Sequence, residues 1–369
     1  MLRQINHLGN CSQSAQATRV RQAIERYLDN WLTVGMDWEY WMQEVNLAKH
    51  EFARLINADV SEIAVSTSAS EAVASIASGL NFQTGLRRKV VTTEAEFPTV
   101  AQVWLGHQKY GCKVEFVPVR RGRLHLEDFE RYIDQETAIV STTHVYYQNG
   151  YKQDLAPVID IAHRNGALVL VDAYQSLGTT PVDVKALDVD LLVSGNLKYL
   201  LGTPGIAFVY VKKDIVPMFE PAVTGWFGQE NPFAFNVTYL DYARDARRFD
   251  TGTPPIMAAF AARAGMQILN EVGIERIGKR IDQLSQHALR VADELALPLL
   301  SPREVSAKGA TTAIKVPDSH LMEEQLKRRD IIASARGEAI RIAPHFFTTE
   351  DDITAALWQI RNLLGCVRE

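Results

Sequence analysis

Two charged residues in the middle of the chain follow apolar runs, and their types suggest chemistry. Asp172 ends the apolar run at residues 167–171, and Lys198 closely follows the run at residues 190–193. A buried lysine with a lowered pKa stays partly neutral and can attack a carbonyl carbon, as Schiff-base chemistry requires. A pyridine cofactor needs an acid beside its ring nitrogen. The pair therefore indicates a site in which Lys198 binds an aldehyde carbon while Asp172 keeps a ring nitrogen protonated.

Asp172 and Lys198 lie in a part of the chain where short apolar runs rich in β-branched residues alternate with helix-like segments. The runs predicted as strands are residues 63–65, 89–92, 114–117, 138–141, 167–171, 190–193 and 206–211. Strands that alternate with helices are joined by crossovers, which give a mostly parallel sheet covered on both faces. The sequence thus predicts an α/β fold with a sheet of about seven strands. Because ligands bind outside the carboxyl ends of such strands, Asp172 and Lys198 should face one crevice.

The rest of the chain predicts two further parts. Helix-like patterns at residues 257–269 and 274–295 are followed by strand-like and helix-like segments, which predict a smaller C-terminal α+β domain. We expect an N-terminal arm at 1–18 that packs with the small domain and the cleft, a large cofactor-binding domain at 19–253 and the small domain at 254–369.

The segments "VDAYQSLGTTPVDV" and "DVDLLVSGNLKYLLGTPGIAFVYV" resemble the class V aminotransferase family of pyridoxal-phosphate enzymes, which have fold type I. In that family an Asp shortly before a Gln or His is followed by a Ser-Gly-x-Lys stretch. The resemblance, from about Asn10 to Asp352, implies pyridoxal 5'-phosphate as cofactor and Lys198 as the catalytic Schiff-base lysine. It also implies that Asp172 pairs with the ring nitrogen, that Gln175 hydrogen-bonds the ring hydroxyl and that Ser194 contacts the phosphate.

Further segments match cofactor contacts of the family. In "VSTSASEAVASIASGL" a strand ends and a helix opens, so free N–H groups and a positive dipole end face an anion, although an ordinary helix cap has the same pattern. By resemblance, Ala69 and Ser70 hold the phosphate, Phe97 stacks on the pyridine and Trp226 lies at the cofactor. Thr253 in "FDTGTPP" matches a segment that reaches the neighbouring subunit's phosphate, which implies a homodimer with sites at the interface.

Other segments, among them "HVYYQNGY", "GWFGQ" and "IRIAPHFFTTEDDI", are similar to kynureninase and its relatives. Arg341 matches the arginine that grips the substrate α-carboxylate with two donors. Asn10 and Gln148 would line the same cleft. The related cysteine desulfurases carry a catalytic cysteine that "RRDIIASARGEAIRI" lacks, so persulfide chemistry is disfavoured, and Cys11 is expected to be a small buried thiol.

The composition of the chain limits the kinds of molecule that it is expected to bind. The 369 residues are 47% hydrophobic and carry a formal net charge of -5, which gives no field that attracts nucleic acid or anionic lipid. The three cysteines lack a metal-ligand spacing, and no run approaches the roughly 20 apolar residues that a membrane helix needs. The amino terminus lacks the apolar core of a signal peptide. We therefore expect a soluble cytoplasmic protein without metal, nucleic acid or membrane partners.

These observations lead to a hypothesis with alternatives. The first is a pyridoxal-phosphate enzyme that acts on a small α-amino acid through Lys198, with Cα deprotonation and with transamination as the leading reaction. A kynureninase-like or β-eliminating lyase, or an epimerase, would use the same residues. A non-catalytic regulatory subunit that binds the cofactor is a third reading, against which the retained Lys198 argues.

Overall fold

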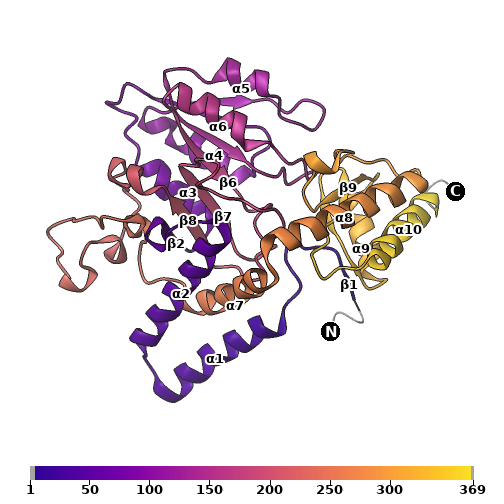
Figure 1. Cartoon of the computed structure of the whole chain (residues 1–369), viewed down its shortest axis with the longest axis horizontal. Helices are drawn as coiled ribbons and strands as arrows, with labels where there is room; N and C mark the ends of the chain where they lie inside the picture. The colour runs from indigo at the N-terminus through magenta and orange to yellow at the C-terminus, as the bar shows by residue number, and fades with distance from the viewer. Residues whose placement is uncertain (1–4, 367–369) are drawn as a thin grey trace.

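The structure is a computed structural model that describes residues 5–366, and a seven-stranded sheet forms its centre (Figure 1). The strand order is β2-β8-β7-β6-β5-β3-β4, and only β8 runs antiparallel to its neighbours. The strands are β2 (Ile63–Ser66), β3 (Lys89–Thr93), β4 (Lys113–Val117), β5 (Thr137–Thr143), β6 (Leu168–Asp172), β7 (Leu191–Gly195) and β8 (Ala207–Val211). The predicted α/β fold with a mostly parallel sheet is confirmed, and each of the seven predicted runs overlaps one strand.

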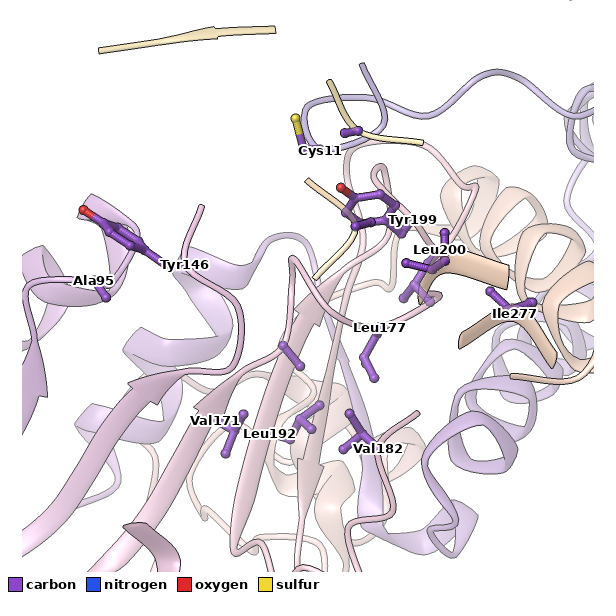
Figure 2. Close-up of a cluster of buried hydrophobic side chains, with 14 of the residues drawn as sticks. Cys11, Ala95, Tyr146, Val171, Leu177, Val182, Leu192, Tyr199, Leu200 and Ile277 are labelled. Atoms are coloured by element: carbon purple, nitrogen blue, oxygen red, sulfur yellow. The ribbon is translucent and has the colours of Figure 1, made fainter. Parts of the chain in front are cut away.

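Helices cover both faces of this sheet because its strands are apolar on both sides. In β6, Val169 and Val171 belong to one buried cluster while Leu170, between them, belongs to another. Successive strand residues point to opposite faces, so each cluster lies on its own side of the sheet. One cluster includes residues of α2 (Trp38–Ile56), α5 (Leu126–Tyr132), α6 (Leu155–Arg164) and α7 (Ile256–Val272), and the other includes residues of α3 (Ala69–Ser78) and α4 (Pro98–His107). Figure 2 shows Val171 and Leu192 in the first cluster, which extends to Ile277 of α8 (Ile274–Glu294).

The helices of this part of the chain are connections between strands or additions at the edge of the domain. They are α1 (Thr18–Val34), α2 (Trp38–Ile56), α3 (Ala69–Ser78), α4 (Pro98–His107), α5 (Leu126–Tyr132), α6 (Leu155–Arg164) and α7 (Ile256–Val272). Short 3-10 helices are η1 (Val60–Glu62), η2 (Gln108–Tyr110), η3 (Lys213–Met218), η4 (Trp226–Gly228), η5 (Pro232–Ala234), η6 (Ala246–Phe249) and η7 (Val305–Ala307). α1 projects from the body in Figure 1 and packs against α7.

The C-terminal part lies to one side of the large sheet (Figure 1) and contains a small antiparallel sheet in the order β11-β12-β9. Its elements are α8 (Ile274–Glu294), β9 (Thr312–Lys315), α9 (Ser319–Lys327), β10 (Ile331–Ile332), β11 (Ser334–Arg336), β12 (Ala339–Ile342) and α10 (Glu350–Cys366). Near the amino terminus, β1 (Asn6–His7) pairs with β10, so this segment joins the C-terminal part. The three-domain division stays a prediction, and α7, which it assigns to the small domain, packs along α1 and α2.

Two features of residues 5–366 concern membranes and metal ions. Within residues 5–366, no helix is long and apolar enough to cross a membrane. The same residues contain no group of three or more His, Cys, Asp or Glu side chains that could hold a metal ion.

Candidate active site

A cleft of about 370 Å³ opens at the carboxyl ends of β6 and β7. It is built from three distant parts of the chain: the segment after β1, the loops of the large sheet and the β11–β12 hairpin. The lining residues are Cys11, Ser12, Thr67, Ser68, Ala69, Ser70, Phe97, Thr99, Val100, Thr143, Tyr147, Asp172, Tyr174, Gln175, Leu197, Lys198, Pro204, Gly205, Ile206, Arg336 and Arg341. Asp172 and Lys198 therefore face one cleft, as the strand pattern predicted.

Lys198 lies partly exposed in this cleft between two aromatic rings. Its Nζ is 4.0 Å from the ring centroid of Tyr174 and 5.6 Å from that of Phe97. Burial lowers the pKa of Lys198 to about 8, although the negative charge of Asp172 acts in the opposite direction. A lysine with this pKa keeps a substantial neutral fraction near neutral pH, which nucleophilic attack requires.

Asp172 ends β6 as a buried carboxyl group, and only 7% of the residue is exposed. One of its oxygens accepts the Tyr174 backbone N–H at 2.8 Å. Burial raises the pKa of Asp172, while the Tyr174 N–H and the charge of Lys198 act to lower it. Gly195 at the end of β7 makes room for the Tyr174 ring, because a Cβ there would lie 2.1 Å from a ring carbon.

The first turn of α3 lies on the cleft wall, where an anion was predicted to bind. Ser68 caps the helix, since its Oγ accepts the Glu71 N–H at 3.2 Å. The N–H groups of Ala69 and Ser70 come in the first turn, where an α-helix has no carbonyl partner to offer, and the helix dipole is positive there. Such an end suits a phosphate group. Ser70 Oγ also lies 3.3 Å from Thr99 Oγ1, so two hydroxyl groups meet beside this turn.

Phe97 and Gln175 add an aromatic face and an amide to the cleft. Phe97 is 39% exposed and lines the cleft, with the Tyr147 ring packed edge-on against it at 5.2 Å between centroids. Gln175 is buried, and its Nε2 donates to the Cys11 carbonyl at 3.0 Å, which leaves its Oε1 available as an acceptor. Together the lining supplies an amine, an acid, an aromatic face and a helix N-terminus. These groups fit the aldehyde, ring nitrogen, ring face and phosphate of pyridoxal phosphate.

Arg341 enters the cleft from β12 and is held by hydrogen bonds. Its guanidinium donates to the Tyr147 carbonyl at 2.6 Å, to Ser334 Oγ at 2.7 Å and to Ser12 Oγ at 3.1 Å. Only 1% of Arg341 is exposed. Its Nε also donates to the Ser334 carbonyl at 3.4 Å, so one of its five N–H donors, on Nη1, remains for a carboxylate.

The structure does not bring five of the predicted residues into the lining of this cleft. Ser194 is buried in β7, and its hydroxyl donates to the Gly195 carbonyl at 2.9 Å. The Asn10 amide donates to the Ala343 carbonyl at 2.7 Å, so Asn10 anchors the segment that carries Cys11. The exposed Gln148 donates to the Tyr147 hydroxyl. Trp226 packs with its ring stacked on Phe235, and Thr253 lines a separate cavity of about 270 Å³.

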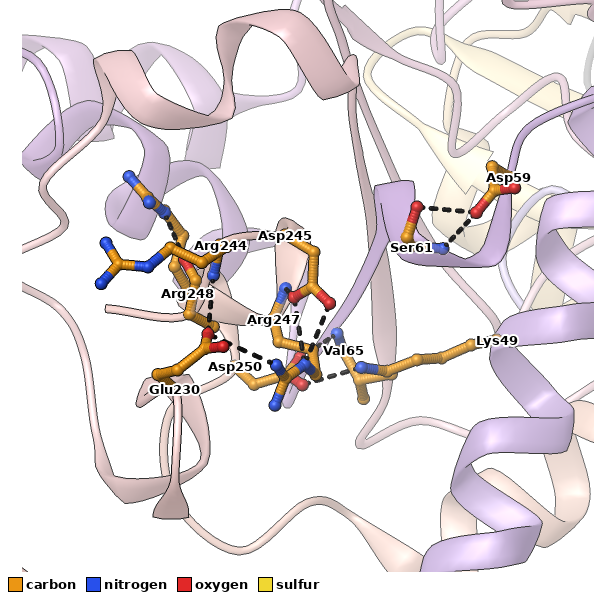
Figure 3. Close-up of polar contacts among 11 residues, drawn as sticks. Lys49, Asp59, Ser61, Val65, Glu230, Arg244, Asp245, Arg247, Arg248 and Asp250 are labelled. Atoms are coloured by element: carbon orange, nitrogen blue, oxygen red, sulfur yellow. Dashed lines mark hydrogen bonds and ion pairs between the residues drawn. The ribbon is translucent and has the colours of Figure 1, made fainter. Parts of the chain in front are cut away.

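The loop before Thr253 is anchored by a buried ion pair (Figure 3). Lys49 Nζ lies 2.7 Å from one oxygen of Asp250, and the Val65 N–H donates to the other oxygen at 2.7 Å. Thr251 Oγ1 donates to Glu71 of α3 at 2.9 Å, which links this loop to the first turn of that helix. Thr253 is therefore presented by a braced loop, on a surface outside the cleft of its own chain.

Fourteen of the 21 lining residues were not predicted as site residues, among them Ser12, Tyr147, Tyr174 and Arg336. Tyr174 stands between Asp172 and Gln175 in "VDAYQ", so its position along the loop was a usable signal. Ser12 and Arg336 come from opposite ends of the chain, and no local pattern marks them. Cys11, expected to be a small buried thiol, is 1% exposed and also contributes to the lining.

The fold and this cleft define a pyridoxal-phosphate enzyme of fold type I. The family model described as "Aminotransferase class-V" matches residues 10–353. The chain belongs to this family and is a pyridoxal-phosphate-dependent enzyme.

Three similar proteins illustrate the range of the family. The chain is 38% identical to a Bacillus subtilis protein described as "Uncharacterized aminotransferase YcbU", over 96% of this chain and 93% of that protein. It is 27% identical to a kynureninase of Pseudomonas fluorescens, over 76% of this chain and 67% of the relative. A solved structure of a C-DES mutant with glycine covalently linked to the pyridoxal-phosphate cofactor has a TM-score of 0.89 and 18% identity, with 98% of this chain and 97% of that chain covered. At that identity the structure supports the fold alone.

Proposed function

We propose that this enzyme transforms a small α-amino acid by removing its Cα proton, and that it is an aminotransferase. The observation that carries the proposal is the single cleft in which Lys198, Asp172 and Arg341 meet. Each supplies a separate requirement: a base with a pKa of about 8, an acid for a ring nitrogen and a cation for the α-carboxylate.

Different residues of the cleft would bind different parts of the cofactor. When bound, pyridoxal phosphate supplies an aldehyde that captures an amino group and a ring that spreads the electron pair released at Cα. Ala69 and Ser70 would hold its phosphate through the N-terminal end of α3. Phe97 would cover a ring face, and Asp172, ionised beside a protonated nitrogen, would keep that nitrogen positive. Gln175 would contact the ring hydroxyl through its amide.

Lys198 and Arg341 act on the substrate in this proposal. Arg341 is already oriented by the Tyr147 carbonyl and by two serine hydroxyls, and it would hold the α-carboxylate with its remaining Nη1 donor and with the Nη2 donor that now binds Ser12 Oγ at 3.1 Å. Lys198, once free of the aldehyde carbon, would take the proton from Cα as general base. Tyr174, whose ring centroid lies 4.0 Å from the Lys198 Nζ, would flank the amine during this transfer.

Transamination is preferred because the chain is 38% identical to a relative that is described as an aminotransferase. The same residues would serve a lyase or an epimerase, since these reactions share the removal of the Cα proton. The reactions differ in where the proton returns and in which form the cofactor is left, so the outcome can be read from the cofactor itself.

The test is a single-turnover absorbance experiment on the holoenzyme. The protein is mixed with a panel of amino acids without added keto acid, and the final form of the cofactor is identified. Conversion to pyridoxamine phosphate with a stoichiometric keto acid supports the aminotransferase. Return to the starting spectrum with repeated formation of a cleaved or inverted product would instead mean a lyase or an epimerase. A Lys198→Ala protein that turned over amino acids at the normal rate would refute the proposal as a whole.

We also propose that the enzyme is a homodimer in which Thr253 completes the partner's phosphate site. Thr253 lies outside the cleft of its own chain, on the loop braced by Asp250. Phe233 lines the same cavity as Thr253. A second copy would cover exposed apolar side chains of α1, of the turn after it and of the segment that carries Phe233: Leu28, Trp31, Leu32, Val34, Met36, Phe233, Phe235 and Val237. Light scattering should give the mass of two chains, and a monomer with full cofactor affinity would refute this assignment.

A further inference from the structure

A second arginine of the cleft, Arg336, is not needed by the proposed chemistry. Arg336 ends β11 and pairs with Ala339 across the hairpin, while Ser334 pairs with Arg341. Alternate residues of a strand share a face and directly paired residues share it too, so Arg336 and Arg341 project from the same face of this hairpin. That face forms one wall of the cleft that holds Lys198.

The two arginines differ in how their charges are used. Arg341 is 1% exposed and donates to the Tyr147 carbonyl and to two serine hydroxyls. Arg336 is exposed, and within residues 5–366 its guanidinium makes no hydrogen bond or ion pair. The nearby Glu338 is engaged elsewhere, because its carboxylate pairs with Lys315 at 2.7 Å. Arg336 therefore presents its donors to whatever enters the cleft.

The lining of the cleft contains more basic than acidic side chains, which indicates that its ligand is anionic. Asp172 is the only acid in its lining, whereas Lys198, Arg336 and Arg341 are basic. In the proposed function the cofactor phosphate lies at α3, Asp172 serves a ring nitrogen, and the substrate α-carboxylate occupies Arg341. Arg336 is then the basic residue of the lining to which the proposed function assigns no anion. A planar guanidinium with free donors favours an oxyanion that can accept two hydrogen bonds.

We infer that Arg336 recognises a carboxylate on the substrate side chain, so that the substrate is an acidic α-amino acid. This inference rests on the proposed function, since it uses Arg341 for the α-carboxylate. It adds a specificity residue and a substrate class to the same site. The hairpin fixes the spacing of the two cations: only Gly337 and Glu338 separate Arg336 from its partner Ala339, and Gly337 turns the chain with a φ of 55°.

Pairs of acids and amides test the inference on the holoenzyme by equilibrium absorbance titration. L-Glutamate should bind at least about tenfold more tightly than L-glutamine, or L-aspartate than L-asparagine, because only the acids can pair with Arg336. Arg336→Gln should weaken binding of the preferred acid by roughly 10- to 100-fold and leave its amide nearly unchanged. Arg336→Lys should retain part of the preference. Arg329→Gln, at an exposed arginine outside the cleft, is the matched control and should change neither affinity.

Binding of glutarate and valerate, measured by calorimetry, gives a second readout that needs no turnover. Glutarate should bind more tightly, and Arg336→Gln should remove the difference. Equal affinity for acids and amides, or an equal loss for both in Arg336→Gln, would overturn the inference. Loss of cofactor from Arg336→Gln would overturn it too, since the arginine would then serve the phosphate. If amino acids change the spectrum without preference for acids, this inference alone fails. If neither amino acids nor carboxylates bind, the proposed function fails with it.

Discussion

The Lys198 amine should react with an aldehyde near neutral pH far faster than an ordinary lysine does. Burial lowers its pKa from 10.5 to about 8. At pH 7 an amine with the lower value is about 9% neutral, whereas one with the ordinary value is about 0.03% neutral. Because only the neutral amine attacks, the reactive population of Lys198 should be about 300 times larger. The amine lines an open cleft, so a small aldehyde can reach it.

Reductive methylation with formaldehyde and cyanoborohydride measures this difference on the cofactor-free protein. The rate at each lysine is followed by peptide mass spectrometry from about pH 6 to pH 10, with the exposed Lys279 on α8 as internal reference. Labelling of Lys198 should level off above about pH 8. Asp172→Asn should move this inflection to lower pH, because the Asp172 charge raises the lysine pKa. The reasoning fails if Lys198 and Lys279 share one pH profile, or if Asp172→Asn moves the inflection upward.

Three further substitutions test other parts of the structure. Arg341→Leu should weaken substrate binding by about 2–5 kcal/mol while cofactor affinity is kept, and an unchanged substrate Kd in absorbance titration would remove Arg341 from the site. Glu96 is 4% exposed, and burial and Asp172 raise its pKa well above the usual value. Since the folded protein then favours the protonated form, wild-type stability should fall as pH rises above the ordinary glutamate pKa. In urea unfolding near pH 8, Glu96→Gln should be more stable than the wild type by about 1–3 kcal/mol, and this gain should disappear in acid. Parallel pH profiles of the unfolding free energy for the two proteins would contradict this. Lys49→Met should lower the free energy of unfolding by about 3–5 kcal/mol, because it leaves the Asp250 carboxylate buried without its cation. The double variant Lys49→Met/Asp250→Asn should recover part of this loss. An unchanged urea midpoint in Lys49→Met would show that the ion pair is dispensable.

The sequence by itself determined the sheet and the two central residues of the site. Strand and helix patterns are local, so the seven strands could be located from runs of β-branched residues between helix-like segments. Once the strands are parallel, the residues after β6 and β7 must lie at one edge, and this placed Asp172 and Lys198 together. The short strands β1, β10 and β11 were missed, because two or three residues carry no periodicity.

Only the tertiary structure decided where the other side chains point. Similarity to a family assigned Ser194 to the phosphate, but both faces of β7 are buried, and the hydroxyl binds the neighbouring Gly195 carbonyl. Ser12 and Arg341 are separated by 329 residues in the chain, and their contact depends on how the amino-terminal segment packs on the C-terminal part. The placement of Arg336 and Arg341 on one face depends likewise on the register of one hairpin. The lowered pKa of Lys198 also comes from burial by distant segments, because desolvation depends on what surrounds a group in space and not on its neighbours in the sequence.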